Sequence, residues 1–291
     1  MPQLHVRTEL PSAQGGVIDL ISGHPVFARA WRGRAHRGVV LCLHGAESHS
    51  GWFNLVAGAL QASDLDVFAY DRMGWGQSPG DTGELASLHD IYDELCSLIY
   101  ILRESYDRIH LLGMSWGGLY ALYAGHHLLP IVNSISVISP GLFLRFPFDR
   151  GSFKYTLLEI MKNRHWRFNL TYLPEDFCSD PKQAKFVEED PWRLKSVGPR
   201  FVAATLWMQS VIRSPLFKRP QGNFYVLLGD QDRMIHIQRT ADFCDEKELS
   251  FKTLAGGHTL ILDNPLEVAR HLAKVDGDSI FEEPLELRKV D

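Results

Sequence analysis

The sequence predicts an α/β fold, in which a mostly parallel central sheet is flanked by helices. Two observations support this class: short apolar runs of strand length alternate with helix-length segments along the first half of the chain, and the alternation resumes near its end. Alternating strands and helices form right-handed crossovers, which leave the strands parallel and cover both faces of the sheet. The chain has 291 residues, 45% of them hydrophobic, which is enough to bury a large core.

The predicted strands and helices follow from apolar runs and their spacing. Two strands are expected at the sheet edge and the next four in its buried centre, at 17–20, 25–29, 38–43, 67–70, 109–112 and 135–138. Residues 52–61 can form a helix, and apolar side chains between Leu88 and Leu102 recur at helical spacing. Late strands are expected at 223–228 and 249–254, and a last helix at 266–273.

The alternation stops between the sixth strand and residue 222. Residues 141–221 contain no strand-like run and mix aromatic with charged side chains, which indicates a helical insertion. We therefore expect three parts: the first part of the core at 1–140, a helical cap or lid at 141–221, and the second part of the core at 222–291.

Composition and charge argue against several classes of protein. The net charge is −5 and Lys and Arg do not cluster, so neither a nucleic acid nor an anionic membrane surface is the expected partner. No run approaches the roughly eighteen apolar residues of a membrane-spanning helix, and residues 1–10 lack the apolar region of a signal peptide. The four cysteines lie far apart, as free thiols in a reducing cytoplasm do. We expect a cytoplasmic monomer or homodimer without stable membrane insertion.

A G-x-S-x-G motif places a candidate nucleophile at Ser115. The motif, residues 113–117, lies between the predicted strand at 109–112 and a helix-like stretch from Gly118, which is the setting of the nucleophile turn in α/β-hydrolases. Such a sharp turn strains the serine backbone and raises its hydroxyl above the sheet, while the flanking glycines avoid collisions. The N-terminus of the following helix would point at the developing oxyanion.

The G-x-S-x-G motif occurs a second time, at residues 76–80. Here no apolar strand leads into Gly76, and Pro79 follows the serine. Proline has no backbone N–H, so the residue after Ser78 could not donate to an oxyanion. Ser78 is predicted to be a loop serine, and Ser115 is selected by its setting and its later partners.

A serine hydroxyl needs a base, usually a histidine that a carboxylate orients. In this fold the acid follows one late strand and the histidine follows the next. The loop after 223–228 offers Asp230 and Asp232, and the loop after 249–254 leads to His258. Asp230 could cap the turn directly after the strand, whereas Asp232 lies further out and can reach the histidine. The predicted triad is therefore Ser115, Asp232 and His258.

Other histidines fit other roles better. His44 is an alternative catalytic base, but it precedes the nucleophile and so violates the order Ser, Asp/Glu, His of this fold. His126 and His127 lie near the end of the helix after Ser115, where the helix dipole favours them. No H-x-x-x-H pair or other ligand spacing supports a metal site.

Two backbone N–H groups are expected to form the oxyanion hole. One belongs to Trp116, directly after the nucleophile, and the other to Ala46, in the loop after the strand at 38–43. Gly45 allows the tight turn that this loop needs.

Four separated blocks resemble the monoglyceride lipase and lysophospholipase branch of the α/β-hydrolases. They are residues 44–51, 71–78 and 113–118, and the late pair 229–232 and 257–258. Residues 189–194 and 199–201 are similar to the cap of that branch, so the likeness runs from about residue 38 to residue 271. The resemblance implies an esterase or lipase acting on a monoacylated, partly polar substrate, with the same triad and oxyanion donors and no cofactor.

Two residues depart from that branch. Glu47 stands where the branch often has glycine, and Trp116 where it usually has methionine. A carboxylate beside the oxyanion loop could repel an anionic substrate or contact a hydroxylated head group, and the indole could narrow the acyl side of the pocket. Glu47 is therefore a candidate substrate-binding residue, together with four aromatic residues of the cap: Phe143, Phe146, Trp166 and Trp207.

The sequence predicts a serine hydrolase whose substrate is a small-molecule carboxylic ester of a hydrophobic acyl group. A monoacylglycerol, a lysophospholipid or a similar small ester would be cleaved through an acyl-enzyme. Two other classes could use the same features: an acyltransferase or carbon–carbon bond hydrolase with this triad, and a non-catalytic ligand-binding protein of the same fold. Competing acyl acceptors separate transfer from hydrolysis, and a serine-reactive fluorophosphonate separates an enzyme from a binding protein.

Overall fold

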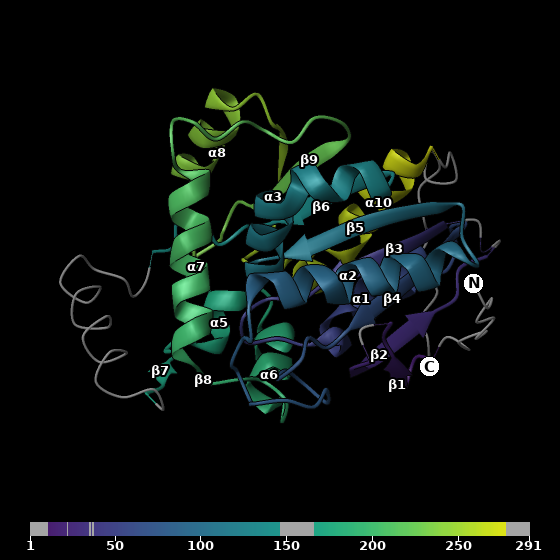
Figure 1. Ribbon diagram of the computed structural model, residues 1–291. Helices are drawn as coiled ribbons and strands as arrows, with labels where there is room; N and C mark the ends of the chain where they lie inside the picture. Colours follow the sequence, from purple (N-terminus) through teal and green to yellow (C-terminus); the bar gives the residue numbers. More distant parts are fainter. Residues whose placement is uncertain (1–10, 22, 35, 37, 146–165, 278–291) are drawn as a thin grey trace.

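The computed structural model describes residues 11–21, 23–34, 36, 38–145 and 166–277 (Figure 1). An eight-stranded sheet runs through it in the order β1-β2-β4-β3-β5-β6-β9-β10. The strands are β1 (Gly16–Asp19), β2 (Pro25–Trp31), β3 (Gly38–Leu43), β4 (Leu65–Tyr70), β5 (Arg108–Met114), β6 (Ser134–Ile138), β9 (Phe224–Gly229) and β10 (Ser250–Leu254). β1, β2 and β4 pair antiparallel, and all neighbours from β4 to β10 pair parallel. The predicted mostly parallel sheet is confirmed.

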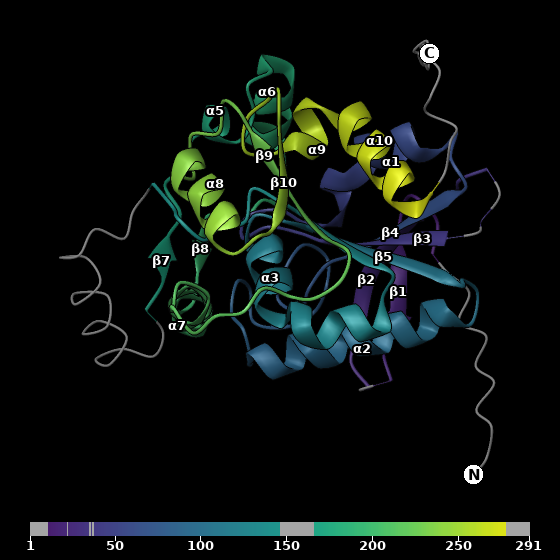
Figure 2. The same ribbon diagram turned by 90° about the horizontal axis from the view of Figure 1, so that it is seen from above.

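Helices cover both faces of this sheet. Figure 2 shows α1 and α10 on one face and α2 and α3 on the other. The helices of the core are α1 (Asn54–Leu60), α2 (Leu88–Arg103), α3 (Trp116–Leu128), α8 (Ile237–Glu246), α9 (Leu260–Asp263) and α10 (Pro265–Asp276), with 3-10 turns η1 (Ser50–Phe53) and η2 (Leu129–Ile131). None of the helices in the described ranges has the length and apolarity needed to cross a membrane.

The central strands are buried along their whole length because helices lie on both sides of them. Every residue of β3, β4 and β6 is buried. The sequence of β3 is accordingly a continuous apolar run, as in strands that are covered on both faces, whereas Ser134 and Ser136 alternate with apolar residues in β6. β4 starts two residues before its predicted start because Asp66 interrupts the apolar pattern. Its buried carboxylate accepts hydrogen bonds from Arg32, Tyr106 and the N–H of Gly33, which compensate for its burial.

The chain leaves the sheet after β6 and returns at β9. Its described elements in between are β7 (Phe168–Asn169), α5 (Pro174–Phe177), α6 (Pro181–Glu189), β8 (Ser196–Val197) and α7 (Pro199–Ile212), and we call residues 166–212 the cap. In Figure 1 the arrow of β5 points toward the cap, so the cap lies beyond the carboxyl ends of the strands. β7 and β8 pair antiparallel over two residues each, a ladder too short to leave a pattern in the sequence.

The buried sheet should contribute more to the free energy of unfolding than exposed positions do, and two leucine variants test this. Leu111 of β5 is 0% exposed and Leu216 is 87% exposed. We expect Leu111→Ala to lower the free energy of unfolding by about 2–5 kcal/mol, because it removes buried methyl groups and leaves a cavity. Leu216→Ala, the matched control, should change it by less than about 0.5 kcal/mol. Urea unfolding followed by tryptophan fluorescence measures both, and equal midpoints would contradict this view of the core.

Candidate active site

Ser115 lies in the sharp turn between β5 and α3, with φ 53° and ψ −112°. A non-glycine residue enters this positive-φ region only under constraint from its surroundings. The N–H of Ser115 donates to the carbonyl of Ile138 at 2.8 Å, which ties the turn to β6. A side chain at Gly113 would lie 2.7 Å from the carbonyl of Gly117, and one at Gly117 would collide with the carbonyl of Leu43. The glycines of the motif therefore permit the close packing that holds the serine.

Asp232 and His258 meet beside this turn. The Nδ1–H of His258 donates to Oδ2 of Asp232 at 2.8 Å, and Oδ1 accepts from the N–H groups of Met234 and Ile235 at 2.8 and 3.1 Å. Burial alone would raise the pKa of Asp232, but His258 and these hydrogen bonds lower it overall, so the carboxylate is ionised. Nε2 of His258 has no hydrogen-bond partner within the described residues, and both His258 and Ser115 line one cavity.

Asp230, the competing acid, has a different role. Its Oδ1 accepts from the N–H of Gly256 at 2.9 Å, and its own N–H donates to the carbonyl of Leu254. Asp230 thus fixes the backbone that leads to His258, as a turn-capping residue does.

His44, the alternative base, has both ring nitrogens occupied. Because a carbonyl can only accept, Nδ1 donates to the carbonyl of Gly45 at 2.9 Å, and Nε2 accepts from the N–H of Arg72 at 3.1 Å. Burial and the positive Arg72 keep the pKa of His44 well below its usual value. A neutral ring with no free nitrogen is a structural element and not a base for Ser115.

Ser78, in the second G-x-S-x-G copy, is also structural. Its hydroxyl donates to the carbonyl of Asp71 at 2.5 Å and accepts from the N–H of Phe27 at 2.8 Å. Gly76 has φ 51°, and a side chain there would collide with the carboxylate of Asp71. This copy of the motif joins the loop after β4 to β2.

The expected oxyanion donors, Ala46 and Trp116, line the cavity beside Ser115. Trp116 is the first residue of the 13-residue helix α3, where backbone N–H groups have no helical acceptor and attract negative charge. Its indole N–H donates to the hydroxyl of Thr205 in α7 at 2.8 Å, and its ring stacks on Phe201 with centroids 4.9 Å apart. Trp116 therefore connects the nucleophile turn with the cap.

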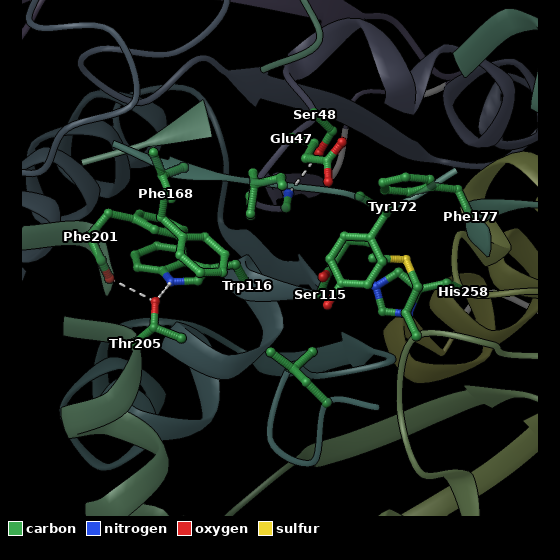
Figure 3. Close-up of a pocket in the computed structure, with 18 of the residues that line it drawn as sticks. Glu47, Ser48, Ser115, Trp116, Phe168, Tyr172, Phe177, Phe201, Thr205 and His258 are labelled. Carbon is green, nitrogen blue, oxygen red and sulfur yellow. Dashed lines mark hydrogen bonds between the residues drawn. The ribbon is translucent and has the colours of Figure 1, made fainter. Parts of the chain in front are cut away.

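The cavity lies between the core and the cap, with an empty volume of about 700 Å³ that includes its opening to solvent. Figure 3 shows Ser115 between Trp116 and Phe201 on one side and His258 and Tyr172 on the other. Most of its walls are apolar, and these include Met114, Leu144, Phe168, Phe177, Val202 and Met234. An apolar cavity with a few polar groups near the nucleophile is typical of small-molecule sites.

Glu47 is the acidic residue of the cavity wall in the described chain, and it is 3% exposed. Its Oε2 accepts from Nε of Arg193 in the cap at 2.8 Å, and its carbonyl accepts from the N–H of Leu194. Oε1 is buried and has no partner within the described residues. Burial raises the pKa of Glu47 to about 7, although Arg193 lowers it in part.

Three of the four aromatic residues expected in the pocket, Phe143, Trp166 and Trp207, do not line the cavity. Phe143 packs against Phe243, Trp166 packs against Phe168, and Phe146 lies outside the described residues. Trp207 is 58% exposed, and its indole N–H donates to the hydroxyl of Tyr123. Other cap residues form this wall instead: Phe168, Leu170, Tyr172, Phe177, Val197 and Phe201. No sequence signal separates the two groups, because both are apolar residues of one irregular segment.

Metal ligands do not gather in the described part of the chain. No three His, Cys, Asp or Glu side chains there are arranged to hold a metal ion.

Known proteins support the family resemblance. The chain is 28% identical over 142 residues to monoglyceride lipase of Homo sapiens, covering 48% of this chain and 46% of that protein. It is 31% identical over 103 residues to proline iminopeptidase of Lactobacillus crispatus, covering 34% of each. The chain thus spans about half the length, or less, of the curated relatives it matches.

Two solved structures share the fold. One is a monoacylglycerol lipase from Paleococcus ferrophilus, with a TM-score of 0.74 and 18% identity; the match covers 87% of this chain and 99% of that one. The other is a soluble variant of monoglyceride lipase from Saccharomyces cerevisiae, in complex with a substrate analog. Its TM-score is 0.75 and its identity 15%, and the match covers 96% of this chain and 99% of that one. The family described as serine aminopeptidase, S33, matches residues 34–263, most of the chain. The chain therefore belongs to the serine aminopeptidase S33 family and is an α/β-hydrolase similar to the monoglyceride lipases.

Proposed function

We propose that this protein is a serine hydrolase that cleaves carboxylic esters of hydrophobic acyl groups through an acyl-enzyme on Ser115. One observation carries the proposal: the Asp232–His258 pair leaves Nε2 of the histidine free in the cavity that Ser115 lines. The strained turn at Ser115 and the similarity to monoglyceride lipases support the same chemistry.

Each group has a defined role in the proposed reaction. His258 accepts the proton of the Ser115 hydroxyl through Nε2 while Oγ attacks the ester carbonyl, and Asp232 stabilises the positive imidazolium. The N–H groups of Ala46 and Trp116 bind the oxygen that becomes negative. The imidazolium then protonates the leaving alcohol. A water molecule, deprotonated by the same histidine, attacks the acyl-enzyme, and the histidine returns this proton to Oγ of Ser115 as the acid is released.

The apolar walls supply the proposed acyl site. An acyl chain that leaves water for a cavity walled by Leu144, Phe168 and Val202 gains about 0.8 kcal/mol for each buried CH₂. The cap contributes much of this wall, which supports a role of residues 166–212 in covering the site. We therefore propose monoacylated, partly polar esters as the substrate class.

Replacement of Ser115 tests the proposed function directly. Ser115→Ala should lower ester turnover by about a millionfold, because loss of one member disables the triad as a unit. It should also abolish labelling by a fluorophosphonate. The matched control is Ser78→Ala, which should keep labelling and turnover and lower only stability, by about 1 kcal/mol for the lost hydrogen bonds. Ester hydrolysis by Ser115→Ala at the wild-type rate would refute the assignment.

Glu47 supports a narrower substrate class. We propose that its free Oε1 accepts a hydrogen bond from a hydroxyl group of the substrate, because a buried carboxylate oxygen needs a donor. Glu47 follows Ala46, the proposed oxyanion donor, so this hydroxyl would lie close to the reacting ester. A monoacylated polyol carries such a hydroxyl donor and fits this oxygen best.

Protonation of Glu47 should weaken the selection of hydroxylated esters. Arg193 occupies Oε2, so a proton added below about pH 7 resides on Oε1 and turns this acceptor into a donor. We expect the ratio of kcat/KM for a monoacylglycerol to kcat/KM for the propyl ester of the same acid to fall roughly tenfold from pH 8 to pH 6, for one charge-assisted hydrogen bond. The ratio cancels every pH effect that the two esters share.

Glu47→Gln should fix this ratio at its low value at every pH, because its amide oxygen faces Arg193 and its NH₂ group replaces Oε1. The control is Glu84→Gln, since Glu84 does not line the cavity and its carboxylate accepts from the N–H groups of Arg200 and Phe201. This variant should keep the wild-type ratio and its pH dependence. A ratio in wild type that does not change with pH would exclude Glu47 from head-group recognition.

A further inference from the structure

A buried arginine lies behind the loop that carries Ala46. Arg72 follows β4, is 1% exposed, and does not belong to the cavity wall. Its Nη1 donates to the carbonyl of His44 at 2.6 Å and its Nη2 to the carbonyl of Gly45 at 2.8 Å. The guanidinium therefore holds two consecutive carbonyl groups of this loop without lining the cavity itself.

This contact fixes the direction of a group that Arg72 does not touch. The carbonyl of Gly45 and the N–H of Ala46 belong to one trans peptide unit, so they point in opposite directions. Because Arg72 and Nδ1 of His44 both hold the Gly45 carbonyl, the N–H of Ala46 points away from Arg72, toward the cavity that Ala46 lines. This N–H has no protein acceptor within the described residues.

Trp75, three residues after Arg72, fixes the peptide unit between Ala46 and Glu47. The indole N–H of Trp75 donates to the carbonyl of Ala46 at 2.7 Å. Arg72 and Trp75 together hold the peptide units on both sides of Ala46, so the loop cannot rotate its N–H away from the cavity without breaking charge-assisted or buried hydrogen bonds.

Two indole rings hold the guanidinium in turn. Its central carbon lies 4.8 Å from the ring centroid of Trp75 and 4.5 Å from that of Trp116. These cation–π contacts compensate in part for the burial of a charge. Burial lowers the pKa of Arg72 to about 10, with Tyr70, Glu94 and Asp71 opposing the shift, so the side chain stays charged at neutral pH. Trp116, one of the two proposed oxyanion donors, thus also contacts Arg72, which holds the loop of the other donor, Ala46.

We propose that Arg72 is a positioning residue that aligns the N–H of Ala46 as an oxyanion donor by holding the carbonyl of Gly45. The inference rests on the proposed ester hydrolysis. An oxyanion forms only after Oγ of Ser115 has attacked, so Arg72 stabilises the transition state and leaves binding of the intact ester unchanged.

Arg72→Met tests this role, because methionine keeps an apolar chain between the two rings and removes both donors. We expect kcat to fall by up to about 100- to 1000-fold with little change in KM, the range found when one oxyanion donor is lost. An alkyl trifluoromethyl ketone, which adds to the serine and forms an oxyanion, should lose affinity by the same factor. The secondary alcohol of the same carbon skeleton forms no oxyanion and should bind as in wild type.

Two further variants keep the inference testable if Arg72→Met does not fold. Arg72→Lys retains the charge and one donor group, and it should recover part of the lost ketone affinity. Trp75→Phe removes only the N–H that holds the Ala46 carbonyl, and it should lower the ratio of ketone to alcohol affinity by a smaller factor. A wild-type ratio in the folded variants would overturn the role of Arg72, whatever their kcat.

The same measurements separate this inference from the proposed function. If wild type hydrolyses no ester and binds the ketone no more tightly than the alcohol, the proposed function fails. If wild type passes both tests and the variants keep its affinity ratio, only the inference on Arg72 fails.

Discussion

The close approach of α3 to the end of β3 is the constraint on which the site depends. Gly117 packs against the carbonyl groups of Leu43 and His44, a distance that no side chain would allow. The same approach holds Ser115 at φ 53° and brings the N-terminus of α3 against the loop that carries Ala46. The proposed nucleophile and the proposed oxyanion donors are therefore parts of one packed unit, and their relative positions follow from the sheet itself.

The core and the cap are joined through this same loop. Glu47 binds Arg193, and the next contact along the loop is between Nε2 of His49 and the carboxylate of Asp190, at 3.1 Å. The indole N–H of Trp52 donates to Asp190 as well. Because these side chains are largely buried, their hydrogen bonds are screened less by solvent than surface ion pairs are. The loop thus carries a proposed catalytic group on one side and anchors the cap on the other.

The sequence predicted most where a chemical role requires a particular residue type at a particular place in the fold. The parallel sheet followed from apolar runs, and Ser115, Asp232 and His258 followed from the order of strands and loops around them. The choice between Ser115 and Ser78 required only the strand, the helix and Pro79, and the hydrogen bonds of Ser78 agree with the loop role expected for it. Spacing along the chain is enough for such residues because each lies in the turn or loop that follows a strand.

The sequence could not predict contacts between segments that no periodicity relates. Arg72 reaches His44 and Gly45 across 28 and 27 residues, and Thr205 meets Trp116 across 89. The cap follows no regular pattern, so aromatic residues that line the cavity could not be told from those that pack elsewhere, such as Trp207. Which apolar side chains face a ligand depends on how short, irregular segments pack, and that is a tertiary property.

Because Arg72 lies outside the cavity wall, residues of that wall can be substituted without touching it. The atoms that orient the Ala46 peptide are separate from those that would contact an acyl chain, such as Leu144, Val202 and Met234. Selection or engineering can therefore resize the acyl site one wall residue at a time while the reaction geometry stays in place. Such a division lets one lineage of enzymes diversify its substrates without rebuilding its catalytic centre.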